Sequence, residues 1–272
     1  MDMLLAVDVG NTTTRFGLFG DDAAADTEPL GTWEVTTPSR MTADEARLTA
    51  TQGVVALSTA APGEANPLNA ILSCVVPSLE AAWTRALTAL CPSRPLVVGP
   101  GLKTGISLRY DDPSEIGSDR IADAVAARER YGSPAIVVDL GTTTNIEVID
   151  ASGAFVGGLI APGLALGARS LADAAARLPV VDVRAPRRVI GRSTREAMRS
   201  GIVLGEAARI DGLLDMVIAE LNDKISNAPR PAIVLTGDDA AAMAAILRHD
   251  VTIDDTLTLR GLAALYLLNH RG

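Results

Sequence analysis

The chain has 272 residues and a formal net charge of −9, with 48% hydrophobic and 21% charged residues. This length suits two modest domains, and the share of apolar residues excludes an intrinsically disordered chain. The acidic balance argues against a nucleic-acid-binding protein, because such proteins need a basic surface for phosphate backbones. The two cysteines, Cys74 and Cys91, are isolated, so we expect neither a disulfide framework nor a structural zinc site.

The first half of the chain is predicted to contain strands followed by helices. Apolar runs bounded by turn residues predict strands over residues 3–9, 14–19, 31–36, 70–76, 96–98 and 106–109. Thr42, with Glu45 three residues later, forms a capping box and predicts a helix start. Pro77 suits the first turn of a helix over residues 77–90, and another helix is expected over about residues 114–131.

The second half repeats this plan. Strands are predicted over residues 135–140, 145–149, 154–160 and 233–235, with a short strand at Val251. Helices are predicted after Pro162, over about residues 194–222, through an Ala-rich segment to Leu247, and from Thr258 onward. Strand clusters followed by helices, twice, indicate an α/β duplication with lobes over residues 1–115 and 116–272.

One motif occurs in both halves, each time between two predicted strands. Residues 7–14 read Val-Asp-Val-Gly-Asn-Thr-Thr-Thr, and residues 138–145 read Val-Asp-Leu-Gly-Thr-Thr-Thr-Asn. The glycine lets the backbone approach a ligand, and successive backbone N–H groups in a turn can bind an anion. The threonine hydroxyls add donors, and the preceding aspartate can hold a divalent cation. A single copy is common as a purely structural turn, but two copies predict two lobes that bind a nucleotide polyphosphate.

Between the two copies, Gly117-Ser118-Asp119-Arg120 stands at the start of a predicted helix. The guanidinium of Arg120 suits a substrate carboxylate, because it can bind both oxygens. The carboxylate of Asp119 suits the acceptance of a proton from an attacking hydroxyl. From these four residues alone, a helix cap followed by a surface arginine is an equally good interpretation.

The chain resembles the type III pantothenate kinases, members of the acetate and sugar kinase, Hsp70 and actin superfamily, from Met3 to about Tyr266. The resemblance includes Asp-Val-Gly-Asn-Thr at residues 8–12, Thr-Ala-Asp-Glu at 42–45, Val-Val-Pro-Ser at 75–78, Val-Gly-Pro-Gly-Leu-Lys-Thr-Gly at 98–105, Gly-Ser-Asp-Arg at 117–120, Val-Val-Asp-Leu-Gly-Thr at 137–142, Gly-Gly-Leu-Ile-Ala-Pro-Gly at 157–163 and Ile-Gly-Arg-Ser-Thr-Arg-Glu-Ala-Met-Arg-Ser-Gly at 190–201. It implies two duplicated RNase H-like lobes of actin-like architecture, with the active site in the interlobe cleft. It also implies ATP-dependent phosphorylation of pantothenate to 4'-phosphopantothenate, the entry step of coenzyme A biosynthesis.

The resemblance implies a role for each matching position. Asp119 would be the catalytic base, Asp8 would lie near Mg2+, and Asp139 would contribute to a site for K+ or NH4+. Pantothenate would be held by Tyr110, Gly117, Ser118, Asp119, Arg120 and Thr194. ATP would be bound by Asp8, Val9, Gly10, Asn11, Thr12, Thr13, Thr14, Arg15 and Thr142.

The resemblance also implies a homodimer, in which Thr194 lines a pocket completed across the interface. From local sequence, Thr194 is almost as well explained as a helix cap ahead of Glu196. The first apolar run is about seven residues, too short for a signal peptide core or a membrane span, so we expect a cytoplasmic protein that binds no membrane. Two alternative functions fit the residues: a catalytically weak or inactive regulatory protein, and a kinase of another small hydroxy acid.

The chain departs from the family pattern at a few positions of the proposed site. Ser118 stands where the family usually has alanine, and Asn145 and Glu147 replace a threonine and an aspartate after the second motif. Asp238 follows Gly237 where a second glycine is usual. These changes bear on catalytic rate and on nucleotide preference.

Overall fold

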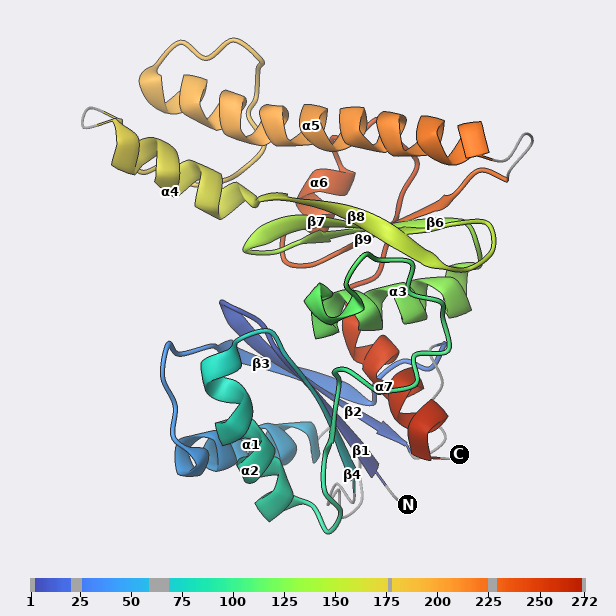
Figure 1. The fold of residues 1–272 in the computed structure, drawn as a ribbon. Helices are drawn as coiled ribbons and strands as arrows, with labels where there is room; N and C mark the ends of the chain where they lie inside the picture. Colours follow the sequence, from blue (N-terminus) through green and yellow to red (C-terminus); the bar gives the residue numbers. More distant parts are fainter. Residues whose placement is uncertain (1–2, 21–25, 59–68, 176–177, 225–228, 271–272) are drawn as a thin grey trace. The chain divides into compact units, whose positions relative to one another are not determined.

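The computed structural model describes residues 3–20, 26–58, 69–175, 178–224 and 229–270. The chain forms two compact units, the first made of Met1–Arg130 with Thr256–Gly272 and the second of Tyr131–Asp255. The end of the chain therefore returns to the unit in which it began. Figure 1 follows this path by colour along the sequence.

The first unit is built on a five-stranded mixed sheet in the order β3-β2-β1-β4-β5. Strands β1, β2 and β3 are antiparallel neighbours, whereas β4 and β5 run parallel to β1. The strands are β1 (Met3–Val9), β2 (Thr13–Gly20), β3 (Gly31–Thr36), β4 (Asn69–Cys74) and β5 (Leu96–Val97). The helices are α1 (Ala43–Ser58), α2 (Pro77–Leu90), the short 3-10 helix η1 (Pro113–Glu115), α3 (Ser118–Tyr131) and α7 (Leu257–His270).

The two faces of the first sheet have different partners, and this decides where Asp8 lies. Residues 3, 5, 7 and 9 of β1 belong to the core formed with α1 and α2. Successive strand residues point to opposite faces, so Leu4, Ala6 and Asp8 share the other face. Gly17, which pairs with Ala6, lies against Leu259 of α7, which packs on β1, β2 and β4. Asp8 therefore lies on the face of the sheet on which α7 packs; Figure 1 shows α7 beside this sheet.

The second unit repeats this topology. Its five-stranded sheet has the order β10-β9-β6-β7-β8, with β6, β7 and β8 antiparallel and β9 and β10 parallel to β6. The strands are β6 (Ala135–Leu140), β7 (Thr143–Ile149), β8 (Phe155–Pro162), β9 (Ala232–Thr236) and β10 (Thr252–Ile253). The helices are α4 (Leu164–Ala174), α5 (Thr194–Lys224) and α6 (Ala240–Ala244).

The long helix α5 runs across one face of the second sheet (Figure 1). Its apolar residues Val203, Ala207, Ile210 and Leu214 recur every three or four positions, as expected of the buried stripe of a helix. They pack against Ile136, Val138 and Leu140 of β6 and against β7 and β9. This packing sets the polar residues between them, Glu206 and Arg209, close to the end of the sheet where the second motif lies.

The predicted α/β duplication is confirmed, with corrections to individual elements. The Ala-rich helix ends at Ala244 and not at Leu247, and the short strand predicted at Val251 is formed by Thr252–Ile253. Residues 106–109 form no extended strand, and only Leu108 takes part in a single β-bridge. Gly105 just before them has a positive φ of 73°, which interrupts an extended chain, and Arg128 donates to its carbonyl. The helix expected from residue 114 begins at Ser118, because Pro113–Glu115 form a separate 3-10 turn.

The second compact unit begins at Tyr131. Helix α3 and the C-terminal helix α7 pack together in the first unit, where Thr258 donates to Asp123 over 2.6 Å. The expected boundary at 115/116 concerns the repeated strand-and-helix plan, and it stays a prediction. Among the described residues, no helix is long and apolar enough to cross a membrane.

Candidate active site

The first motif forms the loop between β1 and β2. Val9 pairs with Thr14, so residues 10–13 make the connection, and the N–H of Gly10 donates to the carbonyl of Thr13 over 3.0 Å. A Cβ at Gly10 would lie 3.0 Å from that same carbonyl oxygen, which explains the glycine. Thr37 holds the loop from the side: its N–H donates to the carbonyl of Thr12 over 2.8 Å. The tip of the loop, Asn11 and Thr12, is exposed and can meet a ligand.

The carboxylate of Asp8 stands beside this loop, opposite Arg15 on β2. On its other side, the parallel pairing of β1 with β4 places Ser73 next to Asp8. The hydroxyls of Ser73 and Ser118 are 2.8 Å apart and buried. This pairing and this hydrogen bond therefore connect the first loop, Asp8 and the start of α3 within one unit.

Asp119 lies in the first turn of α3, next to this hydroxyl pair. Its Oδ1 accepts a hydrogen bond from the N–H of Arg120 over 2.7 Å. A Cβ at Gly117 would lie 2.5 Å from the same oxygen, so the glycine leaves room for the carboxylate to fold back over the helix start. Burial raises the pKa of Asp119, although the N–H and the charge of Arg120 act in the opposite direction. A raised pKa makes the carboxylate a better proton acceptor.

Arg120 is only 6% exposed, so the interpretation of residues 117–120 as a cap followed by a surface arginine is wrong. Tyr110, which the resemblance also places in the substrate pocket, is half-buried and precedes the turn Asp112–Glu115. Asp112 caps that turn by accepting from the N–H of Ser114 over 2.9 Å.

The second motif forms the loop between β6 and β7. Leu140 pairs with Thr144, so only residues 141–143 make the connection, and the N–H of Gly141 donates to the carbonyl of Thr143 over 3.0 Å. Two glycines outside the motif pack on this loop. A Cβ at Gly163 would lie 2.3 Å from the carbonyl oxygen of Gly141, and one at Gly237 would lie 2.7 Å from Oδ1 of Asp139.

Thr194 is the first residue of α5 and is exposed. The helix cap is Ser193 instead: its Oγ accepts from the N–H of Glu196 over 3.3 Å, and its carbonyl accepts from the N–H of Ala197. Glu196 completes a reciprocal arrangement by accepting from the N–H of Arg192 over 2.8 Å. The interpretation of Thr194 as the cap is therefore wrong, and its side chain is available for another role.

The structure also contains site residues that the sequence did not reveal. Ser73 sits in a run of apolar residues and was expected to be part of a buried strand only. Gly163 and Gly237 lie in separate segments, and only the three-dimensional structure brings them to the second loop. Glu206 looked like an ordinary polar residue of a long helix, yet it is 6% exposed and accepts from the hydroxyl of Thr144 over 2.7 Å.

The donor set fits a divalent cation that is bound together with a nucleotide. Asp8 supplies one carboxylate beside the first loop, which carries threonine hydroxyl groups. Within the described ranges, no group of three or more His, Cys, Asp or Glu residues could hold a metal ion. Mg2+ is commonly bound through one or two carboxylates with phosphate and water oxygens supplying the rest, so this sparse protein ligand set suits it.

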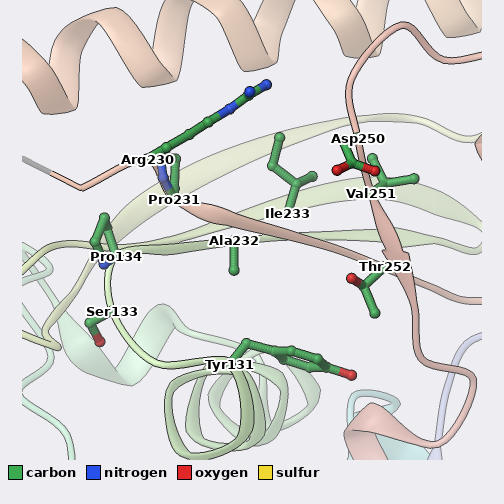
Figure 2. A pocket seen from close by; sticks show the side chains of 10 residues that line it. All are labelled: Tyr131, Ser133, Pro134, Arg230, Pro231, Ala232, Ile233, Asp250, Val251 and Thr252. Carbon is green, nitrogen blue, oxygen red and sulfur yellow. The ribbon is translucent and has the colours of Figure 1, made fainter.

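A polar hollow of about 320 Å³ lies in the second unit, at the end of the sheet remote from the second loop (Figure 2). It is lined by the starts of β6, β9 and β10 and by Tyr131, whose hydroxyl donates to Asp254 over 2.7 Å. None of the predicted site residues lines it. The hollow therefore plays no part in the candidate site.

Comparisons with known proteins show the family and the fold of the chain. A family described as "Type III pantothenate kinase" matches residues 4–216. A relative from Acidobacterium capsulatum, named type III pantothenate kinase, is 36% identical over 274 residues, covering 97% of this chain and 94% of its own. A Campylobacter jejuni structure described as a Baf family transcriptional activator has a TM-score of 0.57 at 18% identity, covering 98% of this chain and 100% of its own. A ROK hexokinase from Thermus thermophilus has a TM-score of 0.51 at 13% identity, covering 97% and 98%. The last two likenesses concern the fold.

Proposed function

The chain belongs to the type III pantothenate kinase family, and from this premise we propose how its residues perform the reaction. The protein is an enzyme that uses ATP to phosphorylate pantothenate, the first step of coenzyme A biosynthesis. The primary hydroxyl oxygen of pantothenate bonds to the γ-phosphorus, the bond to the β–γ bridging oxygen breaks, and ADP leaves. The hydroxyl proton must pass to a base.

Asp119 is that base. The observation that carries this assignment is its position beside the first loop: Asp8 neighbours Ser73 on the adjacent strand, and Ser73 bonds Ser118, the residue before Asp119. A carboxylate whose pKa is raised by burial can hold the hydroxyl by a hydrogen bond and then accept its proton. Because phosphoryl transfer requires little covalent chemistry from the protein, positioning of the two substrates supplies most of the rate.

Pantothenate is bound through its carboxylate and its hydroxyl groups. The buried guanidinium of Arg120 pairs with the carboxylate, because a planar fork can donate to both oxygens. The half-buried Tyr110 lies on the segment that leads to α3 and offers a hydroxyl. Gly117 and Ser118 complete the pocket wall in this unit, and Thr194 of a second subunit completes it from outside.

The nucleotide is bound by the two loops. The first loop contributes Asp8 through Arg15, and the second contributes Thr142. Asp8 holds Mg2+, which when bound neutralises phosphate charge, and Asp139 holds K+ or NH4+. The residues fit these ions because carboxylate and hydroxyl oxygens are the ligands that hard cations prefer.

The assay that tests this proposal measures ADP release from ATP and Mg2+ with and without pantothenate, in K+ and in Na+ as the only monovalent cation. We expect turnover that requires pantothenate and is faster in K+. Turnover with a different hydroxy acid in place of pantothenate would favour a kinase of another substrate. Nucleotide binding with no turnover toward any such acid would favour a regulatory protein. The cytoplasmic location inferred from the sequence stays a prediction.

The proposed homodimer is tested by complementation. Asp119→Asn and Thr194→Trp are each expected to be inactive as pure dimers, the second because the bulky ring would fill the partner's pocket. If Thr194 serves the partner's site, subunit exchange between the two inactive variants restores about a quarter of wild-type activity, because half the dimers carry one intact site. No recovery after exchange verified by differently tagged subunits would place Thr194 outside the partner's pocket.

A further inference from the structure

Helix α5 reaches the second loop through the carboxylate of Glu206. Its Oε1 accepts from the hydroxyl of Thr144, the first residue of β7 that pairs with β6, over 2.7 Å. Both side chains are buried, with 6% of Glu206 and 2% of Thr144 exposed. A buried hydrogen bond to a charged acceptor is stronger than one between neutral groups. This bond therefore fixes the start of β7 to the helix.

Arg209, one turn further along α5, forms a second connection to the same loop. Its guanidinium lies 2.5 Å from Oε2 of Glu206 and donates to the carbonyl of Pro162 over 2.6 Å. Pro162 is followed by Gly163, whose N–H donates to the carbonyl of Thr142 over 3.2 Å. A Cβ on Gly163 would lie 2.3 Å from the carbonyl of Gly141, so this backbone is in close contact with the loop.

The two connections hold the loop at both ends. Glu206 ties Thr144 at its end, while Arg209 ties the backbone that packs on Gly141 and Thr142 at its beginning. Arg209 also neutralises Glu206, which matters because the carboxylates of Asp238 and Asp239 lie nearby. Burial, Asp238 and Glu206 together raise the pKa of Asp239. An unneutralised Glu206 would add to this negative field beside a loop that must accept phosphate.

We propose that Glu206 and Arg209 are positioning residues that hold the second loop in its nucleotide-binding conformation. The inference rests on the proposed role of that loop in binding ATP. Neither residue contacts the reacting atoms in this scheme. They act through Thr144 and Pro162, so their loss weakens nucleotide binding while leaving pantothenate recognition, which belongs to the first unit and to Thr194, unchanged.

The test compares Thr144→Val, Glu206→Gln and Glu206→Ala in two measurements, the calorimetric dissociation constant for ADP and the Michaelis constants for both substrates. We expect Thr144→Val and Glu206→Ala to raise the ADP dissociation constant and the KM for ATP about three- to tenfold. The KM for pantothenate should stay within about twofold of wild type. Glu206→Gln should recover part of the loss relative to Glu206→Ala, because an amide oxygen can still accept from Thr144.

A matched control separates positioning from general support of the helix. Asp215→Asn removes the same charge from the same helix and breaks ion pairs with Arg248 and His249, which do not touch the loop. We expect this variant to bind ADP like wild type. If it weakens ADP binding as much as Glu206→Gln does, or if all variants lose affinity only in proportion to their lowered Tm, the positioning role is overturned.

A double-mutant cycle makes the test specific to the bond. If Thr144 and Glu206 act as one unit, the double variant Thr144→Val with Glu206→Gln should be no weaker in ADP binding than the weaker single variant. Fully additive losses would overturn the proposal. The proposed function and the positioning role can fail independently. A wild-type protein with no pantothenate-dependent turnover would refute the kinase assignment, while ADP binding by the variants would still test the role of Glu206 and Arg209.

Discussion

The two copies of the motif fold into loops of different length, although their sequences are nearly the same. Four residues lie between the last paired residues of the β1–β2 ladder, Val9 and Thr14, whereas three lie between Leu140 and Thr144 of the β6–β7 ladder. The difference changes which side chain faces the aspartate: Arg15 stands opposite Asp8, and Asn145 stands opposite Asp139. A one-residue change in register moves every following side chain to the other face of a strand. A repeated motif therefore does not produce a repeated electrostatic environment.

The surroundings of the loops differ as well. At the first loop, Ser73 stands next to Asp8 on the adjacent strand, and its neutral hydroxyl bonds that of Ser118, the residue before Asp119. The second is enclosed by the backbones at Gly163 and Gly237 and by the charged side chains of α5. We expect variants around the first loop to change the chemical step and variants around the second to change nucleotide affinity or stability.

The largest effect is expected for Asp119→Asn. The substitution keeps the size of the side chain but removes the base, so kcat should fall by about 10²- to 10⁴-fold. The calorimetric affinity for ADP should remain that of wild type. Glu115→Gln, an exposed carboxylate four residues earlier, is the matched control and should be fully active. Near-normal turnover by Asp119→Asn would remove Asp119 from the mechanism.

Variants of the two motif aspartates should differ in which cation requirement they change. Asp8→Asn is expected to raise the Mg2+ concentration needed for half-maximal rate about ten- to hundredfold. Loss of a residue that only supports a metal ligand typically lowers metal affinity by this factor, and loss of the ligand itself should cost at least as much. Asp139→Asn should instead abolish the difference between K+ and Na+ while shifting the Mg2+ requirement little. Titration of each cation at saturating ATP measures both effects. The same cation response in both variants would contradict the distinction drawn between the loops.

The sequence predicted the family, the α/β duplication and the positions of both loops, because each depends on local patterns of apolar residues and glycines. It did not predict that residues 106–109 form only a single bridge at Leu108, since the positive φ of Gly105 that interrupts the extended chain is not evident from the apolar pattern. It also did not reveal Ser73 as a neighbour of Asp8, because sheet register between distant strands is set by packing.

The requirement for glycine at the positions that pack on the second loop could not be predicted from the sequence. Gly163 has an ordinary φ of −73°, so nothing in its local conformation requires glycine. Its necessity comes only from the carbonyl of Gly141, which approaches from a different segment. A contact of this kind leaves no local signature in a single sequence.

Gly163→Ala tests this packing and should affect stability more than chemistry. The added Cβ would lie 2.3 Å from the carbonyl oxygen of Gly141, so the second loop must shift. We expect a loss of about 1–3 kcal/mol in the free energy of unfolding, the range typical of overpacking. Gly167→Ala on α4 meets no atom within 4 Å and should stabilise the helix by up to about 1 kcal/mol. Equal unfolding midpoints in urea for both variants would contradict the contact.

The raised pKa of Asp119 predicts a pH dependence of opposite sign for rate and for stability. The base must be ionised, so kcat/KM should fall as the pH is lowered. The midpoint of this fall should lie at a higher pH than the ordinary aspartate pKa of about 3.9. Because folding favours the protonated form, the ionised group lowers stability at neutral pH. Asp119→Asn should therefore raise Tm at pH 7, and the gain should disappear below the ordinary aspartate pKa. A variant that is less stable than wild type at pH 7 would argue against burial of the carboxylate.

The smallest effect is expected for Ser118→Ala, which restores the residue usual in the family. The substitution breaks the bond between the hydroxyls of Ser118 and Ser73 and removes this partner from the buried hydroxyl of Ser73, at a cost of about 1 kcal/mol in stability. Because Asp119 is held mainly by the N–H of Arg120, kcat should fall no more than about threefold. The exposed Ser78→Ala is the matched control and should change neither quantity.

The double variant Ser73→Ala with Ser118→Ala decides what the hydroxyl pair contributes. Removing both partners leaves no polar group buried alone, so the double variant should be more stable than Ser118→Ala. If its kcat also returns to the wild-type value, the pair is a packing feature of the first unit. If stability recovers but kcat stays low, the bond between β4 and α3 aligns Asp119 with the first loop. The chemical step then depends on a pair of neutral hydroxyls, whereas nucleotide binding depends on the charged side chains of α5.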